Sequence, residues 1–491
     1  MLKANFKANI IFSFVSRLVI YLTPLFLAPY LSRVLGAEGI GIYSHAYSFV
    51  YYFSAAITFG FSSCGINKIA EFRNDKEKYS AYFWTTYFLR SVFFVISTTV
   101  YVFVLIFNGF GHKVNLNIGL SLILVLIASL LENQFLFQGL ENFLIPSIGD
   151  FLVNITYAVC IFCFVKNSND VLLYTILKSG MNVVLYLGTS FVSIRYLTKP
   201  KILWNELGAI IKESALFFLP TILMSLGGQL DQSFIGSFCT EADVGYYQQA
   251  SKLPTLVASF TYAISPVMLS RISYLYHEKR LDEIKKKISE GLTLALFISI
   301  PACVGLYSIG QFFIPLYFGQ EFVASIPIMF ILLPTCIISP IDSILINAYY
   351  YPAKKNKYLT LSLIPAIVGN IILSLFNIII IKMNAQGAAI GTLFSELVLD
   401  TCLVVGARKY IDFPSIVSDV WKIMLGSGMI ALVVVPFCYF VALKQIYLVI
   451  IGILLGIIIY GLVECITREK IITIGFNTLA RKIKGKKNSE Q

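Results

Sequence analysis

Ten ionisable residues interrupt long apolar stretches of this sequence, where charge is costly. The cations are Arg17, Arg90, Lys178 and Lys252, and the anions are Glu132, Asp150, Asp231, Asp342, Glu396 and Asp400. Charged side chains within membrane-spanning helices are rare, and each is a functional candidate by default. Their chemistry would be to bind a charged substrate, to hold a driving ion, or to pair with one another.

The cations predict a site for an anionic substrate. Arg17 and Lys252 lie well inside the first and eighth apolar stretches, on early helices of opposite halves of the chain. Two cations across a water-filled cavity suit a diphosphate, which a guanidinium binds with two parallel hydrogen bonds. Arg90 and Lys178 are further candidates for this cavity. The alternatives are that Arg17 reaches the headgroups along its flexible stem, and that Arg90 and Lys178 pair within one half.

The anions predict ion coupling and gating. Glu396 and Asp400 are four residues apart, on one face of a helix. Carboxylates this close favour a shared, exchangeable proton, although a salt bridge to a neighbouring helix is the alternative. Asp231 is predicted to pair with Lys252 and to gate the cavity until substrate displaces it. The other three acids, expected to be hydrated or paired near helix ends, are Glu132, Asp150 and Asp342.

The elements that must position these side chains are transmembrane helices. The chain is 57% hydrophobic and 13% charged, against roughly 25% charged in soluble domains, so a soluble globular protein is excluded. A bilayer core needs about 20 apolar residues per helix. We predict an all-α membrane protein with fourteen spans, at residues 10–31, 41–66, 81–107, 117–138, 143–165, 171–194, 210–235, 244–270, 288–313, 324–349, 358–381, 387–407, 420–442 and 446–466.

The distribution of cations predicts the orientation. Of the 38 Lys and Arg residues, 29 fall in alternate gaps, at the span ends that adjoin these gaps or in the two termini, five in the other gaps and four deeper within spans. Such asymmetry across short loops is the positive-inside rule, which places both termini in the cytoplasm. The net charge of +12 therefore orients the protein and meets anionic lipid headgroups, and it does not indicate nucleic-acid binding.

An internal repeat predicts two lobes. The segment GIYSHAYS at 41–48 resembles GYYQQASK at 245–252, and the basic loop 68–80 recurs as 271–287. Because six spans separate the copies, both have the same orientation, which is one common transporter design. We expect six-helix lobes at 1–200 and 201–410, two additional helices at 411–467, and a basic cytoplasmic tail at 468–491. His45, in the first copy, is interpreted as a hydrogen-bonded interior histidine.

Several segments resemble Wzx-type polysaccharide repeat-unit flippases of the multidrug/oligosaccharidyl-lipid/polysaccharide exporter superfamily. They are TPLFLAPYLSRVLGAEGIGIY at 23–43, KIA at 68–70, RNDKEK at 73–78, FQGLE at 137–141, DQSFIG at 231–236 and QGAAIGTLFSE at 386–396. The resemblance implies fourteen helices in two pseudosymmetric bundles. It implies alternating access around a cationic cavity, and an undecaprenyl-diphosphate-linked oligosaccharide as substrate. Arg17 and Lys252 match cavity cations of such flippases, and Arg90 and Lys178 match less clearly.

Two other functions compete with this interpretation. A membrane glycosyltransferase or polymerase would usually carry a sizeable outward loop for its chemistry, and the outer gaps here are short. A multidrug exporter of the same superfamily would more often have twelve spans and acidic cavity residues. We therefore expect a transporter without enzymatic activity, cofactor or metal, in the bacterial cytoplasmic membrane. Its expected partners are the lipid-linked oligosaccharide, anionic lipids, and the polymerase and glycosyltransferases of a polysaccharide pathway.

Overall fold

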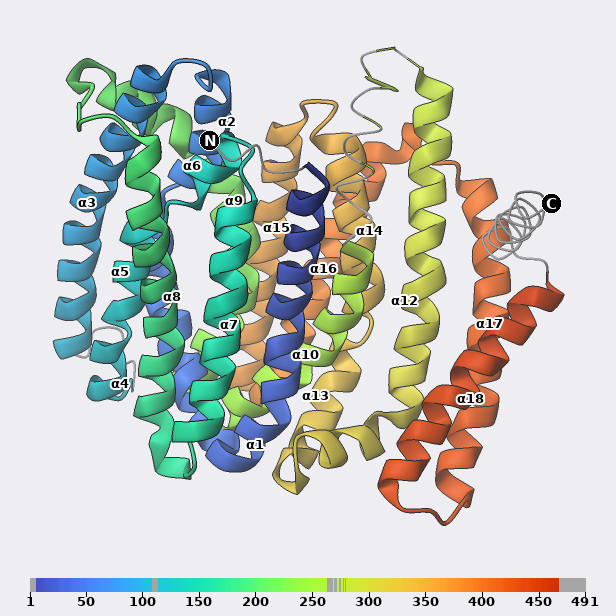
Figure 1. Cartoon of the computed structure of the whole chain (residues 1–491). Coiled ribbons are helices and arrows are strands. Elements are labelled where there is room, and N and C mark those ends of the chain that lie inside the picture. The colour runs from blue at the N-terminus through green and yellow to red at the C-terminus, as the bar shows by residue number, and fades with distance from the viewer. Residues whose placement is uncertain are drawn as a thin grey trace, which may run out of the picture. The chain divides into compact units, whose positions relative to one another are not determined.

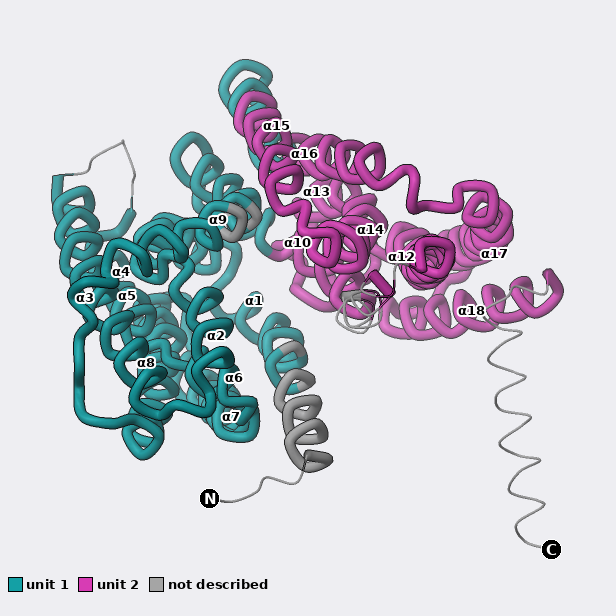
Figure 2. The backbone as a smooth tube through the Cα atoms, turned by 90° about the horizontal axis from the view of Figure 1, so that it is seen from above, with its two compact units in different colours: residues 1–248, 375–388 teal, residues 249–374, 389–491 magenta. Residues whose placement is uncertain are grey.

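The computed structural model describes residues 6–107, 114–262 and 280–467, with five isolated residues between 262 and 280. Side chains are described for these residues except 6–18, 21, 220, 221, 224, 226 and 262. Every element in this part of the chain is helical (Figure 1). The helices form two compact units, unit 1 with residues 1–248 and 375–388, and unit 2 with residues 249–374 and 389–491 (Figure 2).

Unit 1 contains the first nine α-helices and the start of the tenth. Their bounds are α1 Phe6–Thr58, α2 Phe61–Glu71, α3 Lys76–Ile106, α4 Leu116–Ser121, α5 Ile123–Leu131, α6 Gln134–Gly139, α7 Leu144–Phe164, α8 Val171–Ser193, α9 Leu207–Phe238 and α10 Glu241–Tyr262. Short 3₁₀ segments connect them at η2 Ser168–Asp170, η3 Ile194–Tyr196 and η4 Trp204–Glu206, and the π-helical η7 Phe376–Ile380 also belongs here. Helix α1 consists of two helices joined at Gly36, whose φ of 69° suits a residue without a β-carbon.

Unit 2 contains the rest of α10 and the later helices. Their bounds are α12 Leu281–Tyr317, η5 Gln320–Ala324, α13 Ser325–Leu332, α14 Thr335–Leu345, η6 Ile346–Tyr350, α15 Asn356–Leu375, α16 Asn384–Ala407, η8 Arg408–Tyr410, α17 Phe413–Phe440 and α18 Gln445–Ile466. The two units part at residue 248 because α9 and the start of α10 pack with unit 1. The lobe boundary predicted at 200/201 comes from the sequence repeat and differs from this unit boundary, and it stays a prediction.

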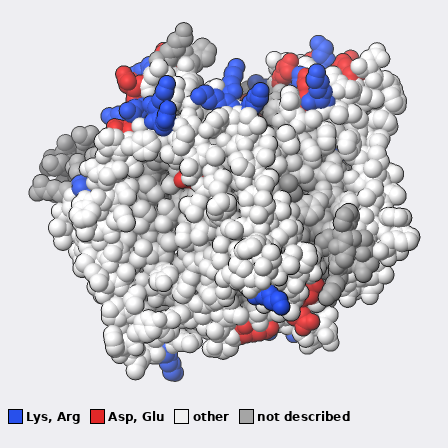
Figure 3. All heavy atoms as spheres, turned by 180° about the vertical axis from the view of Figure 1, so that it is seen from behind, with Lys and Arg blue, Asp and Glu red and all other residues white. Residues whose placement is uncertain are grey.

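The helices have the lengths and surfaces of membrane spans. Among the described residues, ten helices are long and apolar enough to cross a membrane, or eleven if the bent pair Gln320–Leu332 and Thr335–Tyr350 is one span. Large apolar side chains face outward, such as Phe191 at 74% and Phe440 at 86% exposure. Such broad apolar exposure marks a lipid-facing surface. In Figure 3 the charged side chains gather near helix ends, with a mostly uncharged surface between them. The prediction of an all-helical, multi-spanning membrane protein is confirmed.

Loops that are predicted to lie on the cytoplasmic side of the membrane contact one another within each unit. In unit 1, Tyr79 after the α2–α3 corner donates to the Tyr196 carbonyl at 2.8 Å, and Trp84 donates to that of Thr198 at 3.0 Å. In unit 2, the Asp412 amide after η8 donates to Ser289 of α12 at 2.9 Å. Asp75 caps α3 in the first of these loops, and the hydrogen bond from the Lys78 amide lowers the pKa of its carboxyl group.

Candidate functional site

Lys178 is a cation of unit 1 held by aromatic rings. Its ammonium lies 5.2 Å from the ring centre of Tyr43 on α1 and 5.7 Å from that of Tyr174 on α8. It also lies 3.4 Å from the Tyr174 hydroxyl oxygen. No carboxylate of the described residues lies within salt-bridge distance of Lys178. A partly exposed ammonium of this kind keeps its charge available for an anion.

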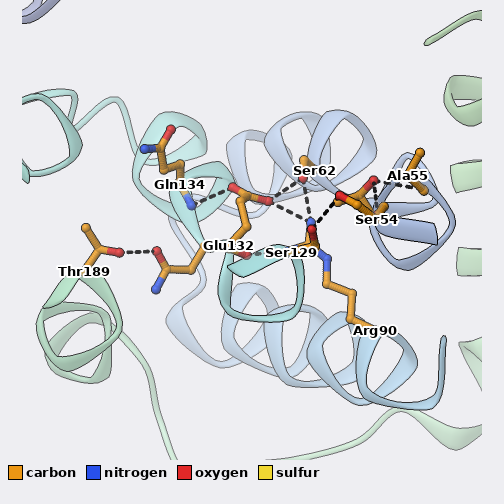
Figure 4. Close-up of polar contacts among 10 residues, drawn as sticks. Ser54, Ala55, Ser62, Arg90, Ser129, Glu132, Gln134 and Thr189 are labelled. Carbon is orange, nitrogen blue, oxygen red and sulfur yellow. Dashed lines mark hydrogen bonds and ion pairs between the residues drawn. The ribbon is translucent and has the colours of Figure 1, made fainter. Parts of the chain in front are cut away.

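Arg90 has a different environment, because its guanidinium is fully buried against Glu132 (Figure 4). Its Nη2 atom lies 2.9 Å from Glu132 Oε2 and donates to Ser62 Oγ at 2.6 Å. The ring centre of Phe135 lies 5.0 Å from the guanidinium carbon. Glu132 is therefore paired, as predicted, and the predicted substrate contact of Arg90 would require this ion pair to open.

The Arg90 site has a structural cause that the sequence did not reveal. The predicted span 117–138 breaks between α5, which ends at Leu131, and α6, which begins at Gln134. A break frees backbone groups that lipid cannot satisfy. Arg90 donates to the freed carbonyl oxygen of Glu132, and the Glu132 carboxylate accepts from the Gln134 amide at 2.9 Å. One ion pair thus stabilises both ends of the break.

The structure places the other predicted substrate and gating residues less directly. Arg17 lies on α1, but its side chain falls outside the described part of the chain. Asp231 on α9 is fully buried and accepts a 2.7 Å hydrogen bond from the hydroxyl of Tyr247 on α10, within unit 1. Lys252 belongs to unit 2, so the predicted pairing of Asp231 with Lys252 stays a prediction.

Unit 2 joins a third acid to the predicted pair on α16. Asp342 of α14 is 5% exposed and interacts electrostatically with Glu396 and Asp400. Its side chain shares a hydrogen bond with that of Asp400, and Glu396 contacts the Ser339 hydroxyl at 3.0 Å. Asp342 lies in the last turn of α14, and its predicted pairing is with another acid rather than with a cation. Asp342 thus joins two partly exposed carboxylates of α16 in one acidic cluster.

The two copies of the repeat touch one another within unit 1. A β-carbon added at Gly41 would lie 1.7 Å from the carbonyl oxygen of Glu241, and one added at Gly245 would lie 2.0 Å from that of Ala37. Non-bonded carbon atoms pack at about 3.5 to 4.0 Å, so only glycine permits this approach. The contact is reciprocal, because each glycine meets the residue four positions before the other glycine.

Polar side chains extend this repeat contact along α1 and α9. His45 is 1% exposed, and its Nδ1 atom lies 2.9 Å from Glu241 Oε1, which confirms the interpretation of a hydrogen-bonded interior histidine. Further along, the hydroxyl oxygens of Ser48 and Ser233 are 2.9 Å apart, and that of Tyr52 lies 3.0 Å from Ser233. Hydrogen bonds between neutral hydroxyls contribute about 1 kcal/mol each.

Unit 2 also contains an apolar groove of about 550 Å³ between α12, α17 and α18. Its lining includes Phe297, Pro301, Gly305, Ile430 and Gly456. The lining side chains are apolar except Tyr460, whose hydroxyl donates to the Phe297 carbonyl at 2.9 Å. Small residues on two of the three helices keep the groove open, so it offers a slot for a hydrocarbon chain.

The overall fold is similar to that of known transporters. The chain is 19% identical to the lipid II flippase MurJ in an inward closed conformation, with a TM-score of 0.74 over 94% of this chain and 99% of that one. A multidrug resistance MATE family transporter of the MOP superfamily is 14% identical, with a TM-score of 0.60 over 81% of this chain and 98% of that one. The fold is therefore that of MurJ and of the MATE transporters.

Sequence comparison identifies the family within that fold. Residues 6–273, more than half of the chain, match the model of the polysaccharide biosynthesis protein family. The chain belongs to this family, which confirms the predicted resemblance. It is 24% identical to the putative O-antigen transporter of Escherichia coli K12 over 277 residues, 55% of this chain and 66% of that protein. It is 23% identical to the probable low-salt glycan biosynthesis flippase Agl15 of Haloferax volcanii over 298 residues, 59% of this chain and 60% of that protein. The matched stretch thus spans slightly less than two thirds of each relative.

Proposed function

We propose that this protein is a flippase that moves undecaprenyl-diphosphate-linked oligosaccharide repeat units from the inner to the outer leaflet of the bacterial cytoplasmic membrane. The observation that carries the proposal is Lys178, a cation in the apolar part of unit 1 whose described contacts are aromatic and hydroxyl groups. An uncompensated ammonium would be costly in lipid, so it is better explained as a ligand for an anionic headgroup. Both sequence relatives are named as transporters of glycans or antigens.

The apolar groove of unit 2 supports an amphiphilic substrate. The groove between α12, α17 and α18 would hold part of a polyprenyl tail. Burial of a hydrocarbon chain contributes about 25 cal/mol per Å² of apolar surface removed from water, although a tail leaving lipid gains less. Moving the substrate across the membrane in this way neither forms nor breaks a covalent bond of the substrate, so the proposal assigns no catalytic residue.

The proposed topology has fourteen spans with both termini in the cytoplasm. Its support is the ten candidate spans, together with four additions. The candidate Leu22–Glu71 counts as two spans, because it contains the break at Gly36. The bent pair counts as one further span. Helices α9 and α10, which are 32 and 22 residues long, are counted as the last two. The predicted basic tail at 468–491 lies outside the described residues.

Deletion of the gene is expected to leave complete lipid-linked repeat units on the inner leaflet. The measurement is extraction of the lipid-linked pool before and after treatment of intact spheroplasts with an external glycosidase. A flippase is supported if the lipid-linked pool of the deletion strain is protected from the glycosidase and becomes accessible to it when a plasmid restores the gene. Single repeat units accessible from outside would instead indicate a polymerase. An unchanged pool with raised drug sensitivity would indicate a multidrug exporter, the alternative that the likeness to MATE transporters favours.

The acidic cluster of unit 2 is proposed to hold the driving proton. We expect Asp342→Asn and the double variant Glu396→Gln/Asp400→Asn to lose most gradient-driven transport, because each removes carboxylates that would share the proton. The measurement is flipping in vesicles with and without a protonophore. The matched control is Asp412→Asn in the loop before α17, which should behave as wild type. Wild-type sensitivity to the protonophore in both test variants would contradict this assignment.

A further inference from the structure

A row of tyrosines runs along α1 beside Lys178. Tyr43, Tyr47 and Tyr51 are spaced four residues apart and share one face of the helix. The rings of Tyr43 and Tyr47 stack with centres 5.7 Å apart and an interplanar angle of 23°, and the centres of Tyr47 and Tyr51 are 6.3 Å apart. Tyr186 of α8 interacts electrostatically with Tyr47. We use the name tyrosine row for Tyr47 and Tyr51 of α1 together with Tyr186 of α8. Tyr43, which contacts Lys178, is not included in this name.

The tyrosine row differs in its hydrogen bonding from two well-buried tyrosines, Tyr101 and Tyr350. Tyr101 donates to the Gly119 carbonyl at 2.7 Å, and Tyr350 donates to that of Leu403 at 2.8 Å. By contrast, no hydroxyl of the tyrosine row bonds to a residue that the structure describes, and all three side chains are partly exposed. A buried tyrosine that serves packing usually finds a partner for its hydroxyl group. Among the described residues, these three side chains therefore leave partly exposed rings and hydroxyl groups without a hydrogen-bond partner.

Lipid does not suit such groups, because it offers a phenol hydroxyl no partner. The row instead continues a polar path, since Lys178 interacts electrostatically with Tyr47, and Tyr186 interacts with Glu132 and Asp150. Pyranose rings have apolar C–H faces that pack on aromatic rings and hydroxyl rims that bond to phenols. The tyrosine row supplies both surfaces, and Lys178 supplies a cation for a phosphate at one end of it.

We propose that the tyrosine row is a saccharide-binding platform, which stacks sugar rings of the cargo while Lys178 binds the adjoining phosphate. The inference rests on the proposed function and adds the part of the substrate that unit 1 recognises. It predicts that the sugar, as well as the diphosphate, contributes to affinity. The platform would tolerate several sugars, because stacking on a ring face demands little of the positions of individual hydroxyl groups.

The test compares two lipids on the purified full-length protein in detergent. One is undecaprenyl diphosphate, and the other is the lipid-linked oligosaccharide extracted from the deletion strain. We expect the wild type to bind the oligosaccharide lipid about tenfold more tightly, the scale expected from two aromatic contacts. Tyr47→Leu/Tyr51→Leu should abolish this preference, whereas Tyr47→Phe/Tyr51→Phe, which keeps both rings, should retain most of it. Lys178→Gln should weaken the binding of both lipids by a similar factor.

The control is Tyr447→Leu on α18, a tyrosine with 54% exposure, which should leave both dissociation constants unchanged. Elution as a single gel-filtration peak and an unchanged melting temperature establish that each variant is folded. Equal affinity of the wild type for both lipids, or a preference that survives in the Leu variant, would overturn the saccharide platform and leave the flippase proposal standing. Failure of the wild type to bind either lipid would overturn both.

Discussion

An oxidative cross-link between cysteines at positions 48 and 233 is expected to stop transport, and its reduction is expected to restore it. The proposed alternating access would require the contact that α1 makes with α9 and α10 to separate during each cycle. In the structure this contact is closed, with the Ser48 and Ser233 hydroxyl oxygens 2.9 Å apart. The measurement is flipping in vesicles that carry Ser48→Cys/Ser233→Cys in a background without the native cysteines. Full transport by the cross-linked protein would show that this contact is static.

Alanine at Gly41 or Gly245 is expected to act in the opposite direction, by preventing closure. The added β-carbon would meet a backbone carbonyl at 1.7 or 2.0 Å, and neither helix has a flexible side chain there that could move aside. Overpacking of this kind costs about 1 to 3 kcal/mol, so the closed state should lose roughly 5- to 150-fold in population. Slower formation of the 48–233 cross-link reports this shift. Gly188→Ala is the matched control, because a β-carbon there meets no atom within 4 Å.

Removal of the Arg90 side chain is expected to cause the largest loss of stability. Arg90→Ala leaves the mostly buried carboxylate of Glu132 without its cation and the carbonyl at the α5–α6 break without its donor. Breaking a buried ion pair from one side costs about 3 to 5 kcal/mol. We therefore expect a lower melting temperature in detergent and reduced expression. An unchanged melting temperature would show that the pair contributes little to folding.

The double variant Arg90→Met/Glu132→Gln separates a structural role of Arg90 from substrate binding. It removes both charges while it keeps side chains of similar volume, and such replacements are often tolerated. We expect it to recover much of the stability lost in Arg90→Ala and to retain transport, since the charge of Arg90 is already compensated by Glu132. A stable double variant without transport would instead assign Arg90 to the cavity, as the sequence alone suggested.

The sequence was a good guide to the features that depend on local composition. Apolar runs of about 20 residues predict helices that cross a bilayer, whatever these helices pack against. Cation asymmetry grouped loops 68–80 and 195–206 on one side, and Tyr79 and Trp84 of the structure do tie these segments together. The similarity of 41–48 to 245–252 marked two segments that the structure places in reciprocal contact.

The roles of the charged side chains could not be predicted in the same way, because they depend on partners far away in the chain. The sequence by itself determined that charges lie in membrane helices, how the loops group, and that the chain repeats, since helix length and charge sign are properties of short segments. Only the tertiary structure decided that Glu132 compensates Arg90, 42 residues away, that Lys178 meets tyrosine rings, and that Asp342 joins Glu396 and Asp400. Packing decides which distant groups share a low-dielectric site, and that sharing determines which charges are compensated and which are available to a ligand.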